Sequence, residues 1–358
     1  MNQKVIASNL GRLEELDFVT GIQRVTLELH RYLDHNLNDN YFKFQGYSRR
    51  KEFSLKPFNK NPTYAEDPIL NQARVSLEKI DVLLLLDLDM NLDFQSIIEM
   101  KSRRNLTVIT NIYDLLPIEH PEWFSKDNSQ HKFMSWLIRI LRVSDHLVFN
   151  SKATLRIFEE LSWSFKGATH LIPLGAMKTK SFLPTFIAPL KTILCVSTIE
   201  PRKGHEDLLN AYDKLLSAGE DFRLIFVGKY GWNSQDLVKR ILNHPEYGKR
   251  FRWYEKVNDD ELLALYNSAT ICVVPSYGEG FGLSIEEALM QGLPVLARDI
   301  PVFRERSYSN LFYFEGGGEK LSSAIINTSK FRHLPDYRNI RKMDQFSSEF
   351  YKLVISSL

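Results

Sequence analysis

The sequence predicts an α/β protein with two domains, each built on an open parallel sheet. Its 358 residues suggest two domains, because a domain usually has about 150 residues. Short apolar runs alternate with amphipathic segments along nearly the whole chain, which is typical of strands and helices in parallel sheets. The alternation lapses over residues 176–192, where Pro184 and Pro189 fall, and we expect the linker there.

Nine apolar runs are the expected strands, and they divide between the two domains. They cover residues 4–8, 80–87, 106–114, 146–151 and 170–175, then 192–197, 222–228, 269–276 and 294–299. Ile22, Val25, Leu29 and Leu33 have helical spacing. The resulting domains are residues 1–178 and 179–335, followed by a helix in 336–358 that could pack on either domain. Ligands of such sheets bind at the carboxyl ends of strands.

Composition and charge exclude several classes of protein. A formal net charge of +2 gives no strongly basic surface, so no nucleic acid is expected as a partner. Cys195 and Cys272 stand in apolar runs, and they make neither a disulfide framework nor a cysteine zinc site. There is no signal-peptide pattern, and no apolar run approaches the roughly 18 residues of a membrane span. We expect a cytoplasmic protein, free or at the inner face of the cytoplasmic membrane.

The densest functional signal is residues 275–299, PSYGEGFGLSIEEALMQGLPVLARD, which begin with a glycine loop. An expected strand ends at Pro275, and a helix is expected near Ser284, with Ser284 and Glu287 as a capping box. The free N–H groups of such a helix start would form an anion site. Glu279 and Glu287, with seven residues between them, could grip paired hydroxyls of a sugar or ribose. The alternative is that Glu287 caps its helix and Glu279 is solvated.

Two further segments carry charge or glycine at expected strand ends. In Glu200–Gly204, Arg202 and Lys203 would face a diphosphate leaving group; the alternative is a solvated pair. At the N-terminus, Gly21 opens a helix and would let the backbone approach a ligand. A dinucleotide fingerprint is disfavoured, because the glycines are spaced G-x-G-x-G, although Asp299 stands where a ribose-binding acid would.

These residues resemble the retaining glycosyltransferases of the GT-B architecture, family 4. The resemblance covers nearly the whole chain and is strongest from Ile193 to Glu305. Its most specific element is the family's E-x7-E motif, matched by Glu279 and Glu287, and the EPRKG segment matches the family's cation-bearing loop. TGIQRV is similar to a subgroup often assigned to mannosyl or related transfers in surface polysaccharide assembly.

The resemblance implies two Rossmann-like domains facing across a cleft, with the C-terminal helix crossing back to the first. It implies that Glu279 contacts the donor sugar, Glu287 the ribose and Lys203 the diphosphate, with Glu279, Lys203 and Arg202 catalytic. The other donor-binding residues it implies are Gly21, Ser197, Val257, Gly280, Phe281, Gly282 and Leu283. Many members carry an arginine where this chain has Ser197, so either Arg202 compensates or the grip on the phosphates is weaker. Tyr113 replaces a frequent histidine before Asp114, so the roles of these two stay open.

The expected reaction moves a hexose, with mannose as the first guess, from a nucleotide sugar to a saccharide or lipid-linked acceptor. No cofactor and no metal requirement are expected, although Asp87 and Asp89 imitate a metal-binding D-x-D motif. Arg139 and Arg142 lie on a helix that either docks on an anionic membrane or belongs to the core. Two alternative functions stay open, a sugar-nucleotide epimerase of similar fold and a non-catalytic carbohydrate-binding or scaffold protein.

Overall fold

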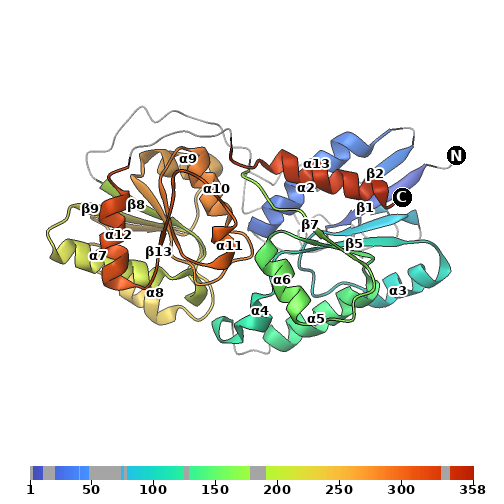
Figure 1. Cartoon of the computed structure of the whole chain (residues 1–358), viewed down its shortest axis with the longest axis horizontal. Coiled ribbons are helices and arrows are strands. Elements are labelled where there is room, and N and C mark those ends of the chain that lie inside the picture. The colour runs from blue at the N-terminus through green and yellow to red at the C-terminus, as the bar shows by residue number, and fades with distance from the viewer. Residues whose placement is uncertain are drawn as a thin grey trace. The chain divides into compact units, whose positions relative to one another are not determined.

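The chain forms two compact units (Figure 1). The computed structural model describes residues 3–10, 21–39, 41–47, 74–75, 79–124, 129–177, 191–331 and 339–358. The first unit comprises Met1–Ile118, Asn128–Leu174 and Met343–Leu358, and the second comprises Glu119–Asp127 and Gly175–Lys342. Most of the predicted linker, as well as Thr20 of the TGIQRV segment, lies outside the described residues.

The first unit is built on a parallel sheet of seven strands among the described residues, in the order β3-β2-β1-β4-β5-β6-β7. The strands are β1 Lys4–Asn9, β2 Phe42–Tyr47, β3 Arg74–Val75, β4 Val82–Leu85, β5 Thr107–Ile112, β6 His146–Phe149 and β7 Ala168–Leu171. The order reverses between β1 and β4, which is the pattern of a doubly wound, Rossmann-like domain.

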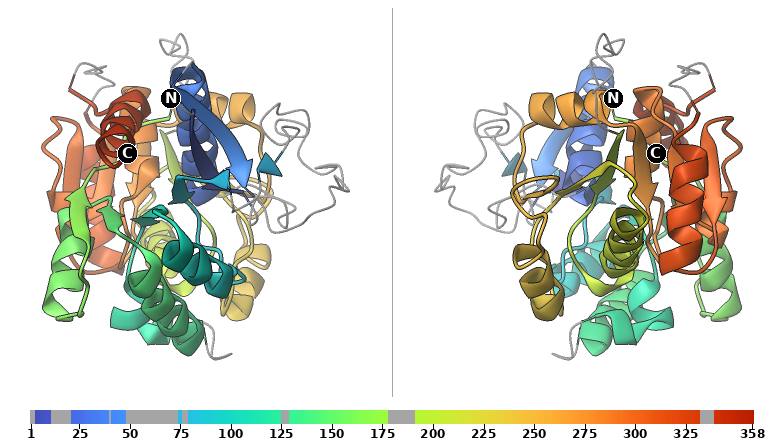
Figure 2. Two further views of the ribbon diagram at one scale, coloured as in Figure 1. Left: turned by 90° about the vertical axis from the view of Figure 1, so that its right-hand side faces the viewer. Right: turned by 90° about the vertical axis from the view of Figure 1, so that its left-hand side faces the viewer.

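Helices cover both faces of this sheet. Successive side chains of a strand point to opposite faces, so the consecutive apolar residues of β4 and β5 need cover on each face. Those of the first unit are α2 Gly21–Leu37, α3 Phe94–Arg103, α4 Leu116–Glu119, α5 Ser129–Val143, α6 Lys152–Glu160 and α13 Met343–Ser356. Leu83 and Leu85 of β4 join one core cluster with α3 and α5. On the other face α13 packs against α2, as Figures 1 and 2 show. The C-terminal helix is therefore part of the first unit.

Helix α5 carries the basic residues that suggested membrane docking. Its apolar residues Phe133, Trp136 and Leu137 are buried in the core, whereas Arg139 and Arg142 are exposed. The apolar side of the helix is thus used in packing. No helix among the described residues combines the length and apolar character that crossing a bilayer requires.

The second unit is a parallel sheet of six strands among the described residues, in the order β10-β9-β8-β11-β12-β13. Its strands are β8 Lys191–Val196, β9 Phe222–Val227, β10 Phe251–Tyr254, β11 Ile271–Val274, β12 Val295–Arg298 and β13 Leu311–Phe314. The strand order reverses between the neighbours β8 and β11. Both units therefore confirm the predicted pair of Rossmann-like domains, and each of the nine predicted runs overlaps a strand, although the run 170–175 shares only its first two residues with β7.

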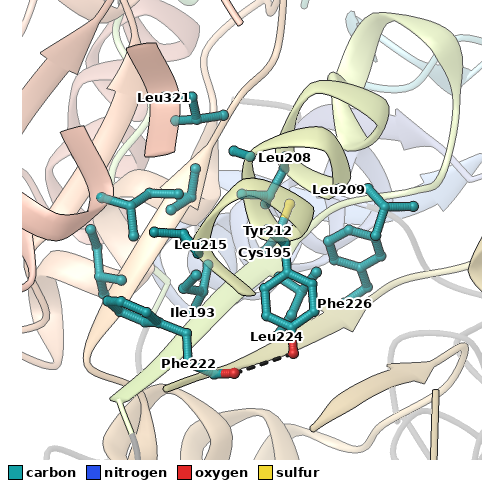
Figure 3. Close-up of a cluster of buried hydrophobic side chains, with 14 of the residues drawn as sticks. Ile193, Cys195, Leu208, Leu209, Tyr212, Leu215, Phe222, Leu224, Phe226 and Leu321 are labelled. Atoms are coloured by element: carbon teal, nitrogen blue, oxygen red, sulfur yellow. Dashed lines mark hydrogen bonds between the residues drawn. The ribbon is translucent and has the colours of Figure 1, made fainter. Parts of the chain in front are cut away.

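The core of the second unit lies on one face of its sheet, beneath α7 His205–Ser217, α8 Gln235–Leu242 and α12 Gly318–Thr328. Tyr212 of α7 is fully buried there and donates a hydrogen bond from its hydroxyl to the carbonyl of Phe222, 3.2 Å away (Figure 3). Helices α7 and α12 lie side by side (Figure 2). Cys195 and Cys272 are buried and free, as expected of packing residues, and burial raises the pKa of the Cys195 thiol to about 12.

The other face of this sheet is contacted by α9 Asp259–Ser268 and α10 Leu283–Met290. The short helices of the second unit are η2 Pro121–Trp123, η3 Pro201–Lys203 and α11 Pro301–Arg304. The sheet directs the loops after β8 and β11 to the same edge, because parallel strands end together. These are the two loops that carry the predicted site.

Candidate active site

Two loops meet where the strand order of the second unit reverses. The first runs from Ser197 through η3 to α7, and the second runs from Pro275 to α10. They are joined by a hydrogen bond from the backbone N–H of Tyr277 to the carbonyl of Arg202, 2.8 Å long. Gly204 makes this approach feasible, because it has φ +67° and a Cβ there would lie 2.2 Å from the carbonyl oxygen of Pro275. The reversal point is where open α/β sheets bind ligands.

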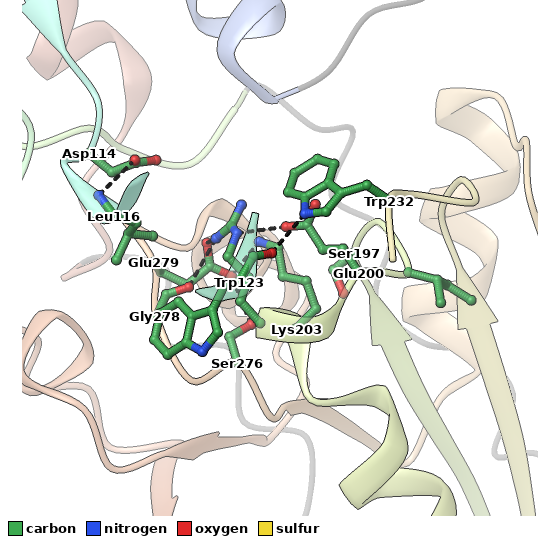
Figure 4. Close-up of polar contacts among 12 residues, drawn as sticks. Asp114, Leu116, Trp123, Ser197, Glu200, Lys203, Trp232, Ser276, Gly278 and Glu279 are labelled. Carbon is green, nitrogen blue, oxygen red and sulfur yellow. Dashed lines mark hydrogen bonds and ion pairs between the residues drawn. The ribbon is translucent and has the colours of Figure 1, made fainter. Parts of the chain in front are cut away.

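Glu279 lies at the centre of the two loops (Figure 4). Lys203 Nζ donates to its Oε1 at 2.5 Å, and the hydroxyl of Ser276 donates to the same oxygen at 2.8 Å. Arg202 Nη1 donates to Oε2 at 3.3 Å. Burial alone would raise the pKa of Glu279, but the charges of Lys203 and Arg202 and the hydrogen bonds from Lys203 and Ser276 lower it to about 2. Glu279 is therefore a firmly ionised, weakly basic carboxylate.

Arg202 connects the two loops through its side chain as well. Its Nη1 donates to the carbonyl of Gly278 at 3.0 Å, and its Nε lies 2.6 Å from Oε1 of Glu200. Glu200 is 2% exposed and Arg202 14%. From the sequence we expected Arg202 to face a diphosphate. In this structure its side chain contacts Glu200 and the glycine loop.

The glycine loop ends at the N-terminus of α10, earlier than the sequence suggested. Gly282, with φ +94°, is the N-cap, and the helix starts at Leu283. The predicted capping box of Ser284 and Glu287 is therefore wrong, because Ser284 already lies inside the first turn. A side chain at position 282 would also be strained, since its Cβ would lie 2.6 Å from the ring of Phe303. In the first turn the N–H of Ile285 donates to the carbonyl of Gly282 at 3.1 Å. The earlier N–H groups, those of Leu283 and Ser284, precede the first bonds of the helix, which is the property of an anion site.

Glu287 lies on α10 and is buried, 4% exposed. Its Oε2 accepts a hydrogen bond from the hydroxyl of Tyr266 at 3.2 Å. The two glutamates of the motif thus differ in their surroundings. Glu279 faces cations, whereas Glu287 is joined to a hydroxyl group of α9.

Two arginines that the sequence analysis missed hold the glycine loop in place. Arg306 donates to the carbonyl of Phe281 at 2.6 Å, stacks on its ring at 4.1 Å, and pairs with the buried Glu286. Arg298 donates to the carbonyl of Pro275 at 2.9 Å and lies 4.0 Å above the ring of Tyr277. Arg298 ends β12, the second element after the loop, and Arg306 follows α11, the third. No local pattern marks either of them.

The remaining predicted donor residues lie at several places. The hydroxyl of Ser197 is 3.3 Å from Nε2 of His205, whose pKa burial and the charge of Lys203 lower to about 3, so this imidazole is neutral. Val257 lies between β10 and α9, at the same edge of the sheet. Gly21 is the first residue of α2, in the first unit. Its predicted contact with a diphosphate stays a prediction.

A segment from the N-terminal half of the sequence packs on the second unit close to these loops. The indole N–H of Trp232 donates to the carbonyl of Trp123 at 2.8 Å, as Figure 4 shows, and Asn233 donates to that of Phe124 at 3.2 Å. Phe124 stacks on Trp232 with ring centroids 5.7 Å apart, and Trp123 lies 6.5 Å from the ring of Tyr277. Sequence position alone assigned this segment to the first domain.

The acids of the two other motifs, the dinucleotide fingerprint and the metal-binding D-x-D motif, have partners within the protein. Asp299 pairs with Arg304 at 2.6 Å. Asp87 accepts from Gln23 at 2.9 Å, and Asp89 accepts from Asn9 at 2.9 Å.

Tyr113 and Asp114 follow β5 in the first unit. The hydroxyl of Tyr113 donates to the carbonyl of Leu86 at 2.8 Å, and burial raises its pKa. Asp114 Oδ1 accepts from the backbone N–H of Leu116 at 3.3 Å (Figure 4). Their roles stay open.

Sequence comparisons match the chain to a family model and to several curated relatives. Residues 183–310 match the family model described as "Glycosyl transferases group 1". The serotype-specific mannosyltransferase WbdA of Escherichia coli is 32% identical over 273 residues, which cover 70% of this chain and 33% of WbdA. The O-antigen chain mannosyltransferase B of Escherichia coli is 27% identical over 258 residues, 67% of each chain. The chain thus spans about a third of the length of the WbdA relatives.

Solved structures resemble the whole chain in fold. Sucrose-phosphate synthase of Thermosynechococcus elongatus has a TM-score of 0.71 and 16% identity, covering 99% of this chain and 100% of that one. HepE of Anabaena, solved in complex with UDP-glucose, has a TM-score of 0.69 and 15% identity over 99% and 100% of the two chains. At this identity the likeness concerns the fold alone.

Proposed function

We propose that this chain, a member of the glycosyl transferases group 1 family with the GT-B fold, is a retaining glycosyltransferase. It would move a hexose, in the first place mannose, from a nucleotide diphosphate sugar to a saccharide or lipid-linked acceptor in surface polysaccharide synthesis. The preference for mannose is supported by the names of the relatives WbdA and O-antigen chain mannosyltransferase B. The proposal includes a cytoplasmic location and no metal requirement.

One observation carries the proposal: a lysine, a carboxylate and a helix N-terminus converge where the strand order reverses. Lys203 and Glu279 are in contact at 2.5 Å, and α10 begins four residues after Glu279. The diphosphate of a donor would bind Lys203 and the N–H groups of the first turn of α10, from Leu283 on. Glu279, released from Lys203, would then accept hydrogen bonds from hydroxyls of the donor sugar.

The remaining contacts of the donor follow from the same edge of the sheet. Glu287 would hold the ribose hydroxyls, which requires them to replace or supplement the hydroxyl of Tyr266. The backbone N–H groups of Gly280, Phe281 and Gly282 would bind the sugar and phosphates, and the loop of Val257 would contact the base. Ser197 would border the diphosphate.

Glu279 is a poor candidate for a nucleophile, which favours a reaction without a glycosyl-enzyme intermediate. Both of its oxygens accept hydrogen bonds, and its pKa is about 2. In the proposed step the bond from the anomeric carbon to the diphosphate oxygen breaks. The acceptor oxygen bonds to that carbon from the same face, and its proton passes to the departing diphosphate. Lys203 would stabilise the charge that develops, and losing such a donor costs about 10² to 10³ in rate.

The test is incubation of the purified chain with a panel of nucleotide sugars, with and without saccharide acceptors and with EDTA present. Acceptor-dependent release of nucleoside diphosphate, absent in Lys203→Ala, would support the proposal. Interconversion of the donor sugar without acceptor would replace it with an epimerase. Failure to bind UDP, GDP or any nucleotide sugar would replace it with a non-catalytic binding or scaffold role.

A further inference from the structure

We propose that Arg202 is a positioning residue, anchored by Glu200, that holds the glycine loop and with it Glu279, and that it does not bind the diphosphate. This inference rests on the proposed function for the identity of the substrate, but its structural part concerns the loop alone. It gives Arg202 a different role from the phosphate contact that the sequence suggested, and it assigns a role to Glu200.

Several contacts of Arg202 lead to the glycine loop. Its carbonyl accepts from the N–H of Tyr277 at 2.8 Å. Its Nη1 reaches the carbonyl of Gly278 at 3.0 Å and Oε2 of Glu279 at 3.3 Å. Through backbone and side chain, Arg202 therefore fixes three consecutive residues that end at the carboxylate proposed to meet the donor sugar.

Glu200 pairs with a different nitrogen of the guanidinium from the one that reaches the glycine loop. It is 2% exposed, and its Oε1 lies 2.6 Å from Nε of Arg202. A buried carboxylate is costly to leave without a cationic partner, so this pair resists separation. With Glu200 on one edge and Glu279 on another, the positive charge of Arg202 faces two negative charges. A diphosphate would have to compete with both of them.

Lys203 contacts the same carboxylate as its neighbour but differs in the chemistry of its side chain. Its side chain reaches the glycine loop through Nζ, which bonds to Oε1 of Glu279 at 2.5 Å. A lysine is a point charge on a flexible stem, whereas the planar guanidinium makes several bonds in fixed directions. Lys203 can therefore change partner when a diphosphate arrives, and Arg202 keeps the loop in place while it does so.

The experiment compares Arg202→Gln, Glu200→Gln and Lys203→Ala with wild type. The control variant is Lys239→Gln, because the side chain of Lys239 is 74% exposed. Two quantities are measured: the affinity for UDP and GDP by calorimetry, and kcat on the donor that wild type accepts. We expect Arg202→Gln and Glu200→Gln to keep the affinity within about threefold while kcat falls about tenfold or more. Lys203→Ala should lose about tenfold or more in affinity. The double variant Glu200→Gln/Arg202→Gln should be no worse than Arg202→Gln.

A second readout does not depend on catalysis. Amide hydrogen exchange without added nucleotide should be faster over residues 276–282 in Arg202→Gln and Glu200→Gln than in wild type or in Lys203→Ala. If wild type turns over no nucleotide sugar, the proposed function fails while this part still decides the role of Arg202. The inference is overturned if Arg202→Gln weakens nucleotide binding as much as Lys203→Ala while Glu200→Gln behaves as wild type. It is equally overturned if exchange in the loop does not change.

Discussion

Nζ of Lys203 lies 2.5 Å from Oε1 of Glu279, although the two residues are 76 positions apart in the sequence. The contact joins the loop after β8 to the loop after β11, the two central strands of their sheet. The cation proposed for the diphosphate and the carboxylate proposed for the sugar are thus each other's partners in this structure. Donor binding has to exchange that ion pair for two new contacts.

The exchange predicts that Glu279→Gln separates binding from turnover. Without the carboxylate, Lys203 faces a neutral amide and a diphosphate no longer meets a negative charge beside it. We expect UDP or GDP to bind as tightly as to wild type or up to about tenfold more tightly, while sugar transfer falls about 10²-fold. Calorimetry and a coupled release assay measure the two quantities. Asp236→Asn, which removes an exposed charge, is the control. Weaker nucleotide binding by Glu279→Gln would contradict the exchange.

The low pKa of Glu279 predicts a particular acid sensitivity of the fold. Its pKa is about 2 in the folded chain against an ordinary 4.5, so its charge stabilises the fold above pH 4.5. That contribution, about 3 kcal/mol at most, is lost as pH falls from about 5 towards 2. Urea unfolding of wild type and Glu279→Gln at pH 6 and pH 3 measures it. The wild type should lose more stability than the variant over this range, and equal losses would refute the assignment.

The pair of Arg306 with Glu286 predicts that replacing Arg306 alone lowers the stability strongly and that replacing Glu286 as well restores part of it. Glu286 is 1% exposed and Arg306 5%, so Arg306→Met leaves a buried carboxylate without its cation, at a cost of about 3 to 5 kcal/mol. Adding Glu286→Leu should recover about 2 kcal/mol, because both charges are then gone. Chemical denaturation measures the three variants. A double variant less stable than Arg306→Met would show that the pair is not what holds this part of the fold.

The hydrogen bond from Trp232 to Trp123 predicts that Trp232→Phe loosens residues 119–124. Phenylalanine keeps a ring for Phe124 to stack on but removes the N–H, which is worth about 1 kcal/mol. Trp163→Phe is a matched control, because Nε1 of Trp163 is buried without a hydrogen-bond partner among the described residues. Denaturation curves should show the larger loss for Trp232→Phe. The attachment would be disproved by equal losses together with unchanged amide exchange over the segment.

Much of the fold could be predicted because apolar periodicity is a local signal. All nine predicted runs overlap strands, but β2, β3, β10 and β13 were not identified. Of these, β10 is an edge strand whose four residues FRWY include the exposed Arg252, and β3 has two residues. Short edge strands bury little apolar surface, so their sequences carry a weak pattern.

For the candidate site, the sequence was sufficient to identify the two loops but not the contacts between them. Glycine spacing and the EPRKG segment located both loops, since such motifs are local. The ion pair of Lys203 with Glu279 could not be foreseen, because it depends on β8 and β11 being neighbours. The start of α10 was misplaced because Gly282 adopts φ +94° as the N-cap, a conformation that several glycines of the loop could equally provide. Trp123 was missed because its segment packs on a unit distant in sequence.

Titration of UDP and GDP into wild type and Lys203→Ala is the most direct measurement of the central claim, that the loops after β8 and β11 hold a nucleoside diphosphate. We predict that wild type binds at least one of the two nucleotides and that Lys203→Ala binds it about 10- to 100-fold more weakly, the value of a charge-assisted hydrogen bond. Binding of neither nucleotide by wild type, or equal binding by Lys203→Ala, would contradict the claim.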